Sequence, residues 1–178
     1  ENNFVGEQID GYNVERVVLT TQAAKALAKV QARLEPFGLS LKFFDGYRPQ
    51  QAVDHFVRWA RDLEDTRMKE QFYPDVPKNR LFKDGYIASR SSHSRGSAVD
   101  LTIADTSGAE LDMGTGFDFF GTESWPESRA VDAQARGNRA FLRQIMTQAG
   151  FRPYSKEWWH FNLNNEPFPK KYFNFPIE

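Results

Sequence analysis

Two histidines stand in surroundings that suggest metal chemistry. His93 lies in the string SSHSRGSAVD, which ends at Asp100, and His160 closes the sequence EWWH, which begins at Glu157. Two imidazoles and one carboxylate, completed by a water, form the open tetrahedral site of a catalytic zinc ion. Gly96 permits a sharp reversal that would bring His93 back over Asp100. The sequence therefore predicts one zinc ion per chain, held by His93, Asp100 and His160.

Hydrolysis at such a site also needs a base and a group that stabilises an oxyanion. Zinc lowers the pKa of its bound water to about 7, and Glu157, three residues before His160, is the candidate base. A regular strand would point positions 157 and 160 to opposite faces, so we expect an irregular strand there. Arg48, fixed by Pro49 at a corner between strand and helix, is the candidate oxyanion stabiliser.

Each of these signals also has a structural interpretation. A lone histidine is more often a satisfied structural residue than a ligand, and we interpret His55, which falls among apolar residues, in that way. Arg48 taken alone would be a surface or ion-pair arginine, and Glu-x-x-His is a weak motif. The combination is far more specific, because the string around His93 and the downstream Glu-x-x-His each supply what the other lacks.

Apolar spacing predicts the elements that position these residues. Residues 22–34 carry apolar side chains at helical spacing before Pro36, and residues 39–44 form a short apolar strand that runs into a turn. A second helix should begin after Pro49. Its expected inner face comprises Val53, Phe56, Val57, Ala60 and Leu63.

A strand over residues 97–103 would turn Val99, Leu101 and Ile103 to the core and Asp100 to the opposite face. A long polar loop and a helix over residues 132–149 follow, and then a strand from Trp158 with an aromatic cover. This irregular order predicts an α+β fold. We expect a single domain over residues 1–178, with a central antiparallel sheet flanked by helices and the zinc site in a cleft at the sheet.

Composition excludes several other classes of function. The formal net charge is −1 and the Lys and Arg residues are scattered, so nucleic acid is not an expected partner. No apolar run approaches the roughly 18 residues that span a bilayer, so we expect no membrane span. Cysteine is absent, which excludes thiolate metal ligands. This absence, with Glu1 in place of Met, favours a periplasmic location, and a cytoplasmic location stays open.

The motifs together resemble the zinc D-alanyl-D-alanine dipeptidases of the VanX type. This family belongs to a wider group that includes D,D-carboxypeptidases, lysostaphin-like endopeptidases and the hedgehog signalling domain. The resemblance runs along nearly the whole chain. It is carried by NNFVG at residues 2–6, DGYRP at 45–49, SSHSRGSAVD at 91–100, DMGTGFD at 112–118 and EWWH at 157–160.

The resemblance implies zinc on the three ligands already named, Glu157 as base and Arg48 as transition-state stabiliser. It further implies that Asp118 takes the free amino group of a small dipeptide and that Ser91 lines the pocket. The expected reaction is hydrolysis of D-Ala-D-Ala to two D-alanines. A D,D-carboxypeptidase acting on peptidoglycan stem peptides and a zinc-binding module without turnover are the alternative interpretations.

Overall fold

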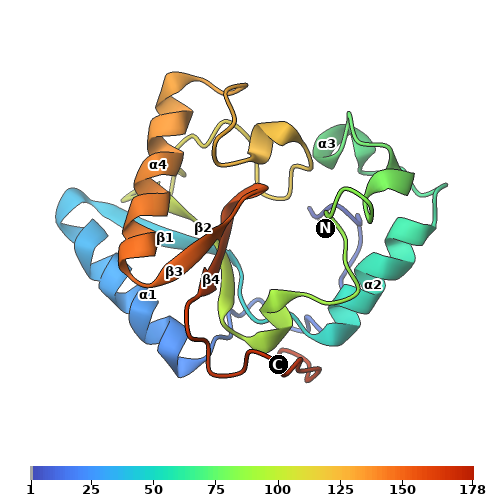
Figure 1. The fold of residues 1–178 in the computed structure, drawn as a ribbon, viewed down its shortest axis with the longest axis horizontal. Coiled ribbons are helices and arrows are strands. Elements are labelled where there is room, and N and C mark those ends of the chain that lie inside the picture. Colours follow the sequence, from blue (N-terminus) through green and yellow to red (C-terminus); the bar gives the residue numbers. More distant parts are fainter. Residues whose placement is uncertain (1) are drawn as a thin grey trace.

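The computed structural model describes residues 2–178 and consists of one antiparallel sheet with helices on both of its faces (Figure 1). Glu1, on which the expectation about location partly rests, lies outside the described residues. The strands are β1 (Leu39–Asp45), β2 (Ala98–Asp105), β3 (Phe151–Tyr154) and β4 (Glu157–Leu163), in the sheet order β1-β2-β4-β3. The helices are α1 (Thr21–Leu34), α2 (Gln50–Arg61), α3 (Lys69–Phe72) and α4 (Ala133–Gln148). These elements confirm the predicted α+β class and the central antiparallel sheet.

Short 3₁₀ helices connect several of these elements. They are η1 (Glu35–Phe37), η2 (Lys78–Arg80), η3 (Ser92–Arg95) and η4 (Thr122–Ser124). Within the described residues, no helix has the length and apolar character needed to cross a membrane.

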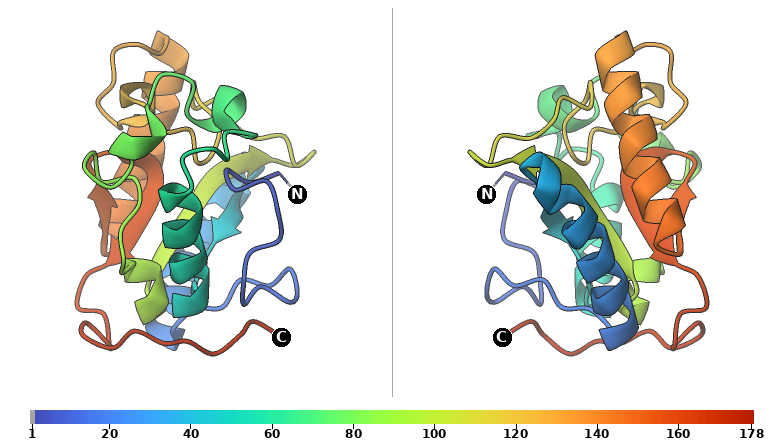
Figure 2. Two further views of the ribbon diagram at one scale, coloured as in Figure 1. Left: turned by 90° about the vertical axis from the view of Figure 1, so that its right-hand side faces the viewer. Right: turned by 90° about the vertical axis from the view of Figure 1, so that its left-hand side faces the viewer.

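The first face of the sheet is covered by α1 and α4, as the right-hand view of Figure 2 shows. Thr20 caps α1 through its side chain, and Leu27 and Val30 of that helix are buried. They pack in one apolar cluster with Val99, Leu101 and other residues of the sheet. The helix predicted over residues 22–34 and the core face predicted for the strand after Ser97 are both confirmed.

The second face looks toward α2, which stands in front of the sheet in the left-hand view of Figure 2. A separate apolar cluster joins Phe56 and Trp59 of α2 to Phe4 and Phe120 from distant segments. The prediction that Leu63 belongs to the inner face of this helix is wrong. The helix ends at Arg61, because Asp62 adopts an extended conformation, and Leu63 is 50% exposed.

Two features of the sheet bear on the site. Strand β2 is buried on both faces, so Ala98 and Thr102 are as inaccessible as the core residues between them. The pairing of β3 with β4 changes register, since Pro153 pairs with Phe161 and Tyr154 pairs with Glu157. The irregular strand expected between positions 157 and 160 is therefore confirmed.

Candidate active site and metal centre

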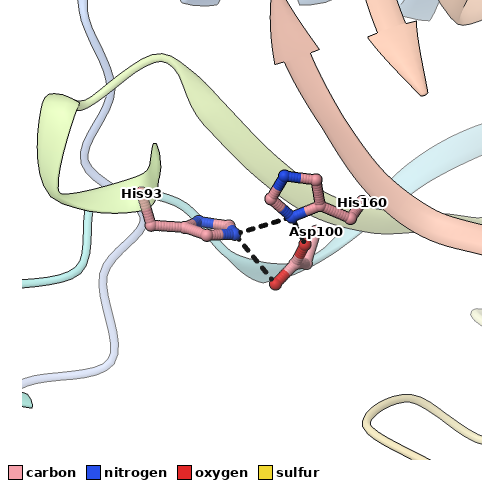
Figure 3. Close-up of side chains that lie close together, drawn as sticks. All are labelled: His93, Asp100 and His160. Carbon is pink, nitrogen blue, oxygen red and sulfur yellow. Dashed lines mark hydrogen bonds and ion pairs between the residues drawn. The ribbon is translucent and has the colours of Figure 1, made fainter. Parts of the chain in front are cut away.

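Three side chains from separate segments converge beside the sheet (Figure 3). His93 comes from η3, Asp100 from β2 and His160 from β4, and all three are buried. His93 Nε2 lies 3.0 Å from His160 Nδ1 and 3.2 Å from Asp100 Oδ2. His160 Nδ1 lies 3.0 Å from Asp100 Oδ1. The predicted ligand set is one compact cluster.

Local backbone structure explains this convergence. The Ser91 hydroxyl accepts a hydrogen bond of 3.2 Å from the His93 backbone N–H and so caps η3. Gly96 ends η3 in the left-handed region, with φ of 77°, and returns the chain into β2. Asp100 and His160 are direct partners in the pairing of β2 with β4. The reversal predicted at Gly96 is confirmed.

The hydrogen bonds of the two imidazoles fit a metal centre. His93 Nδ1 lies 2.7 Å from the Gly46 carbonyl, which can only accept, so Nδ1 carries the proton and Nε2 offers a lone pair toward Asp100. His160 Nδ1 also points to the cluster, while its Nε2 lies 3.3 Å from Ser92 Oγ, a hydroxyl that can accept a proton from it and leave a lone pair on Nδ1. The Asn162 amide, 2.8 Å from the same nitrogen, accepts that proton only with its Oδ1 turned toward the ring. Such outer partners orient histidine ligands in metal sites. Two nitrogen donors and one carboxylate suit zinc.

The Asp100 carboxylate is held in its ionised form. Burial raises its pKa, but the electrostatic influence of His93 and His160, whose ring nitrogens lie within 3.2 Å of the carboxylate, brings the pKa far below its usual range. A buried carboxylate that stays charged provides the negative centre that a bound cation requires.

Glu157 lies beside the cluster at the start of β4. Its Oε2 is 3.8 Å from His160 Nδ1, so the register change places both side chains on one side of the sheet. Burial raises the pKa of Glu157 to about 7, with His160 opposing the shift and Asp100 adding to it. A carboxylate with this pKa can accept and return a proton near neutral pH.

Arg48 occupies the corner between β1 and α2, as predicted. Its guanidinium lies 2.9 Å from Asp45 Oδ2 and 3.5 Å from Asp100 Oδ2. The Tyr12 hydroxyl donates to the same Asp45 carboxylate at 2.9 Å. Burial opposes the charge, but Asp45, Tyr12 and Asp100 raise the pKa of Arg48 above its ordinary value, so it is a permanent cation.

The loop between β2 and α4 carries Asp118 and is fixed by contacts with β1 and α4. The Phe117 ring stacks on Phe44 of β1, with 4.5 Å between centroids. Arg139 of α4 donates to the carbonyls of Met113 and Glu123, each at 2.7 Å. Asp118 itself has a φ of 59°, a strained conformation for a residue with a side chain.

The Asp118 carboxylate is short of partners. Burial and then Asp100 raise its pKa well above the ordinary value, and Arg48 offsets only part of that shift. Among residues 2–178, no hydrogen bond or ion pair to this carboxylate is formed, although Arg48 acts on it electrostatically. A cationic ligand group would supply the missing partner.

All of the predicted site residues line a single cavity of about 320 Å³. They are Arg48, Ser91, His93, Asp100, Asp118, Glu157 and His160. The volume lies at the small end of the range for small-molecule sites. The structure thus brings together every residue that the sequence indicated, while their roles in binding and catalysis stay predictions.

Comparison with protein families decides the class of protein. Residues 1–178 match the model of the family Peptidase_M15, described as D-ala-D-ala dipeptidase. The chain belongs to this family. The resemblance inferred from the motifs is therefore confirmed over the full length of the sequence.

Known members of the D-ala-D-ala dipeptidase family are similar along most of their length. A D-alanyl-D-alanine dipeptidase of Enterococcus faecalis is 44% identical over 177 residues, which is 99% of this chain and 88% of the relative. Another of Streptomyces coelicolor is 45% identical over 177 residues, with the same two shares. A solved structure of VanYB in complex with D-Alanine-D-Alanine is 14% identical, covers 86% of this chain and 79% of that chain, and has a TM-score of 0.48.

Sequence reasoning missed several supporting residues in this dipeptidase-family chain. Asp45, three residues before Arg48 in the DGYRP motif, fixes the arginine and could have been found from that spacing. Tyr12 and Asn162 gave no signal, because their contacts with Asp45 and His160 depend on tertiary structure. The interpretation of His55 as structural agrees with its hydrogen bonds, which join α2 to the N-terminal segment.

Proposed function

We propose that this chain hydrolyses D-Ala-D-Ala to two D-alanines, with zinc held by His93, Asp100 and His160. The observation that carries the proposal is the meeting of this ligand set with Glu157 in one small cavity. A zinc ion bound there would supply Lewis-acid chemistry, since it would lower the pKa of water and polarise a carbonyl group. A structural zinc would need no adjacent base.

The side chains around the ligands provide the remaining chemistry. Glu157 takes a proton from the attacking water and passes it to the nitrogen of the departing D-alanine. Arg48, permanently charged and clamped by Asp45, stabilises the negative charge that develops on the carbonyl oxygen. Removing one such donor typically lowers the rate about 10²- to 10³-fold.

Asp118 gives a reason for dipeptide selectivity. Its carboxylate lines the cavity and forms no hydrogen bond or ion pair among residues 2–178, so the ammonium group of a free dipeptide would pair with it. Ser91 lines the same cavity beside the ligand turn. A substrate whose amino group is acylated has no positive charge to offer and adds bulk, so it should be rejected.

Release of D-alanine by the purified zinc-loaded protein tests the proposal. Free D-Ala-D-Ala, N-acetyl-D-Ala-D-Ala and L-Ala-L-Ala are compared, with a chelator-treated sample as control. We expect turnover of the free D,D-dipeptide alone and its loss on removal of the metal. Equal turnover of the N-acetyl substrate would indicate a D,D-carboxypeptidase, and no turnover by a zinc-loaded protein would favour a binding module.

A further inference from the structure

The charges that line the cavity are divided between two regions. Asp118 lies on the Arg48 side, because both residues also line a neighbouring cavity next to β1. Three other arginines line the cavity, and they are Arg90, Arg95 and Arg152. None of these three lines the neighbouring cavity that Asp118 and Arg48 share.

Arg152 is placed on the site face of the sheet by strand pairing. It lies directly opposite Asn162 in the pairing of β3 with β4, so the two side chains project from the same face. Asn162 Nδ2 lies 2.8 Å from His160 Nε2, on the side of the ring that faces away from the ligand cluster. Arg152 therefore stands beyond His160, at the exposed rim of the cavity.

Arg90 reaches the same region from the segment before η3. Ser92, two residues later, has its hydroxyl 3.3 Å from His160 Nε2. The Arg90 guanidinium lies over the Tyr172 ring at 5.1 Å from the centroid, a cation–π contact that restricts its orientation. Arg90 is thus an oriented cation at the mouth of the cavity.

The three arginines differ in whether their charge is already neutralised. Arg95 makes two contacts of 2.8 Å with the Glu166 carboxylate. Within residues 2–178, neither Arg90 nor Arg152 has a carboxylate within salt-bridge distance. Two cations without an acidic partner therefore share the rim beyond His160.

We propose that Arg90 and Arg152 form a binding site for the C-terminal carboxylate of the dipeptide, at the far end of the cavity from Asp118. The inference rests on the proposed function and extends it by naming the residues that bind the second charged end of the dipeptide. Guanidinium groups suit this ligand, because they can bind a carboxylate through two parallel hydrogen bonds. Asp118 at one end and the arginines at the other would select length as well as charge.

The test compares D-Ala-D-Ala with D-alanyl-D-alaninamide, which is similar in size but uncharged at its C-terminus. Arg90→Gln, Arg152→Gln and the double variant are assayed beside Arg129→Gln, an exposed arginine that lies outside the cavity. We expect kcat/KM for the acid to fall about fivefold in each single variant and more in the double. The amide should be affected no more than in Arg129→Gln, and added salt should reduce the preference for the acid.

A binding measurement separates this inference from the proposed function. Calorimetric titration of both ligands is carried out in a Glu157→Gln background, which needs no turnover. Tighter binding of the acid that disappears in the double variant supports the carboxylate site, even if no substrate is hydrolysed. Turnover that is unaffected by the arginine variants, or equal binding of acid and amide, would overturn the carboxylate site while leaving the dipeptidase proposal intact.

Discussion

The two faces of β2 are equally inaccessible to solvent, but one face is apolar and the other carries ionisable side chains. On one face, Val99, Leu101 and Ile103 are fully buried among apolar side chains from α1 and α4. On the other face, Asp100 lies among two imidazoles and the guanidinium of Arg48. A single strand thus carries both the centre of the core and the centre of the site.

Alternate residues of this one strand therefore serve different purposes. Those on the apolar face stabilise the fold, and those on the polar face form the site. Packing on the apolar face depends on buried area and shape, which any cavity would reduce. The polar face depends on charge, because each ionisable group there is buried and needs a partner. Substitutions on the two faces should therefore fail in different ways.

The largest effect should come from Asp100→Asn, which keeps the shape of the ligand but removes its charge. Loss of an outer-shell partner typically lowers metal affinity about 10- to 100-fold, and loss of a direct ligand should exceed that. We expect zinc affinity to fall by more than about 100-fold and dipeptide turnover to be lost. Competition with a chromogenic chelator measures the affinity, and wild-type affinity in the variant would contradict the assignment of Asp100 as a ligand.

Leu101→Ala, at the position next to Asp100, should lower stability and leave zinc binding unchanged. Leu101 is fully buried, so truncation should cost about 2–5 kcal/mol of the free energy of unfolding. Zinc affinity of the folded protein should stay near that of the wild type. Urea unfolding of the chelator-treated protein measures the first quantity, and a loss of metal binding equal to that of Asp100→Asn would break the comparison.

Glu157 should make the free energy of unfolding of the metal-free protein depend on pH. The pKa of Glu157 is raised to about 7 in the fold, so the native state holds a proton that the unfolded state releases at lower pH. Stability should therefore fall as pH rises toward 7. Glu157→Gln should abolish this loss. Between pH 5 and pH 8, the free energy of unfolding of the variant should therefore rise by up to about 3 kcal/mol relative to that of the wild type.

Urea unfolding of the two chelator-treated proteins at both pH values measures this difference. A pH-independent difference between them would show that Glu157 is not buried in the way described.

The smallest effect should come from Thr102→Val on the same face as Asp100. Thr102 is fully buried, and within residues 2–178 its hydroxyl has no hydrogen-bond partner. Replacing an unpaired hydroxyl with a methyl group of similar shape should change stability by less than about 1 kcal/mol, in either direction. Zinc titration and thermal unfolding should both resemble the wild type, and a marked loss of metal affinity would give Thr102 a role in the site.

Local spacing explains why much of this arrangement could be predicted. Alternation along residues 97–103 identified the core face of β2, and the sequence between His93 and Asp100 indicated a turn with two ligands. The Glu-x-x-His motif predicts that Glu157 and His160 act at one site, and the register change between β3 and β4 lets both side chains reach it. These features depend on residues near one another in the chain.

Features that depend on distant contacts or short segments were not predicted. Strand β3 has only four residues and contains Pro153, so it lacked a strand pattern. The clamp of Tyr12 on Asp45 joins residues 33 positions apart. Asp118 was indicated only by family resemblance, because nothing in its neighbours reveals a left-handed backbone in a loop held by Phe117 and Arg139.

We infer that the polar face of β2 binds zinc and that Glu157 supplies the base. The most direct test is to measure zinc content and D-Ala-D-Ala turnover together in Glu157→Gln. We predict one zinc per chain and a kcat reduced about 10²- to 10⁴-fold, because the variant keeps all three ligands and loses only the proton acceptor. Near wild-type turnover by the zinc-loaded variant would contradict the account.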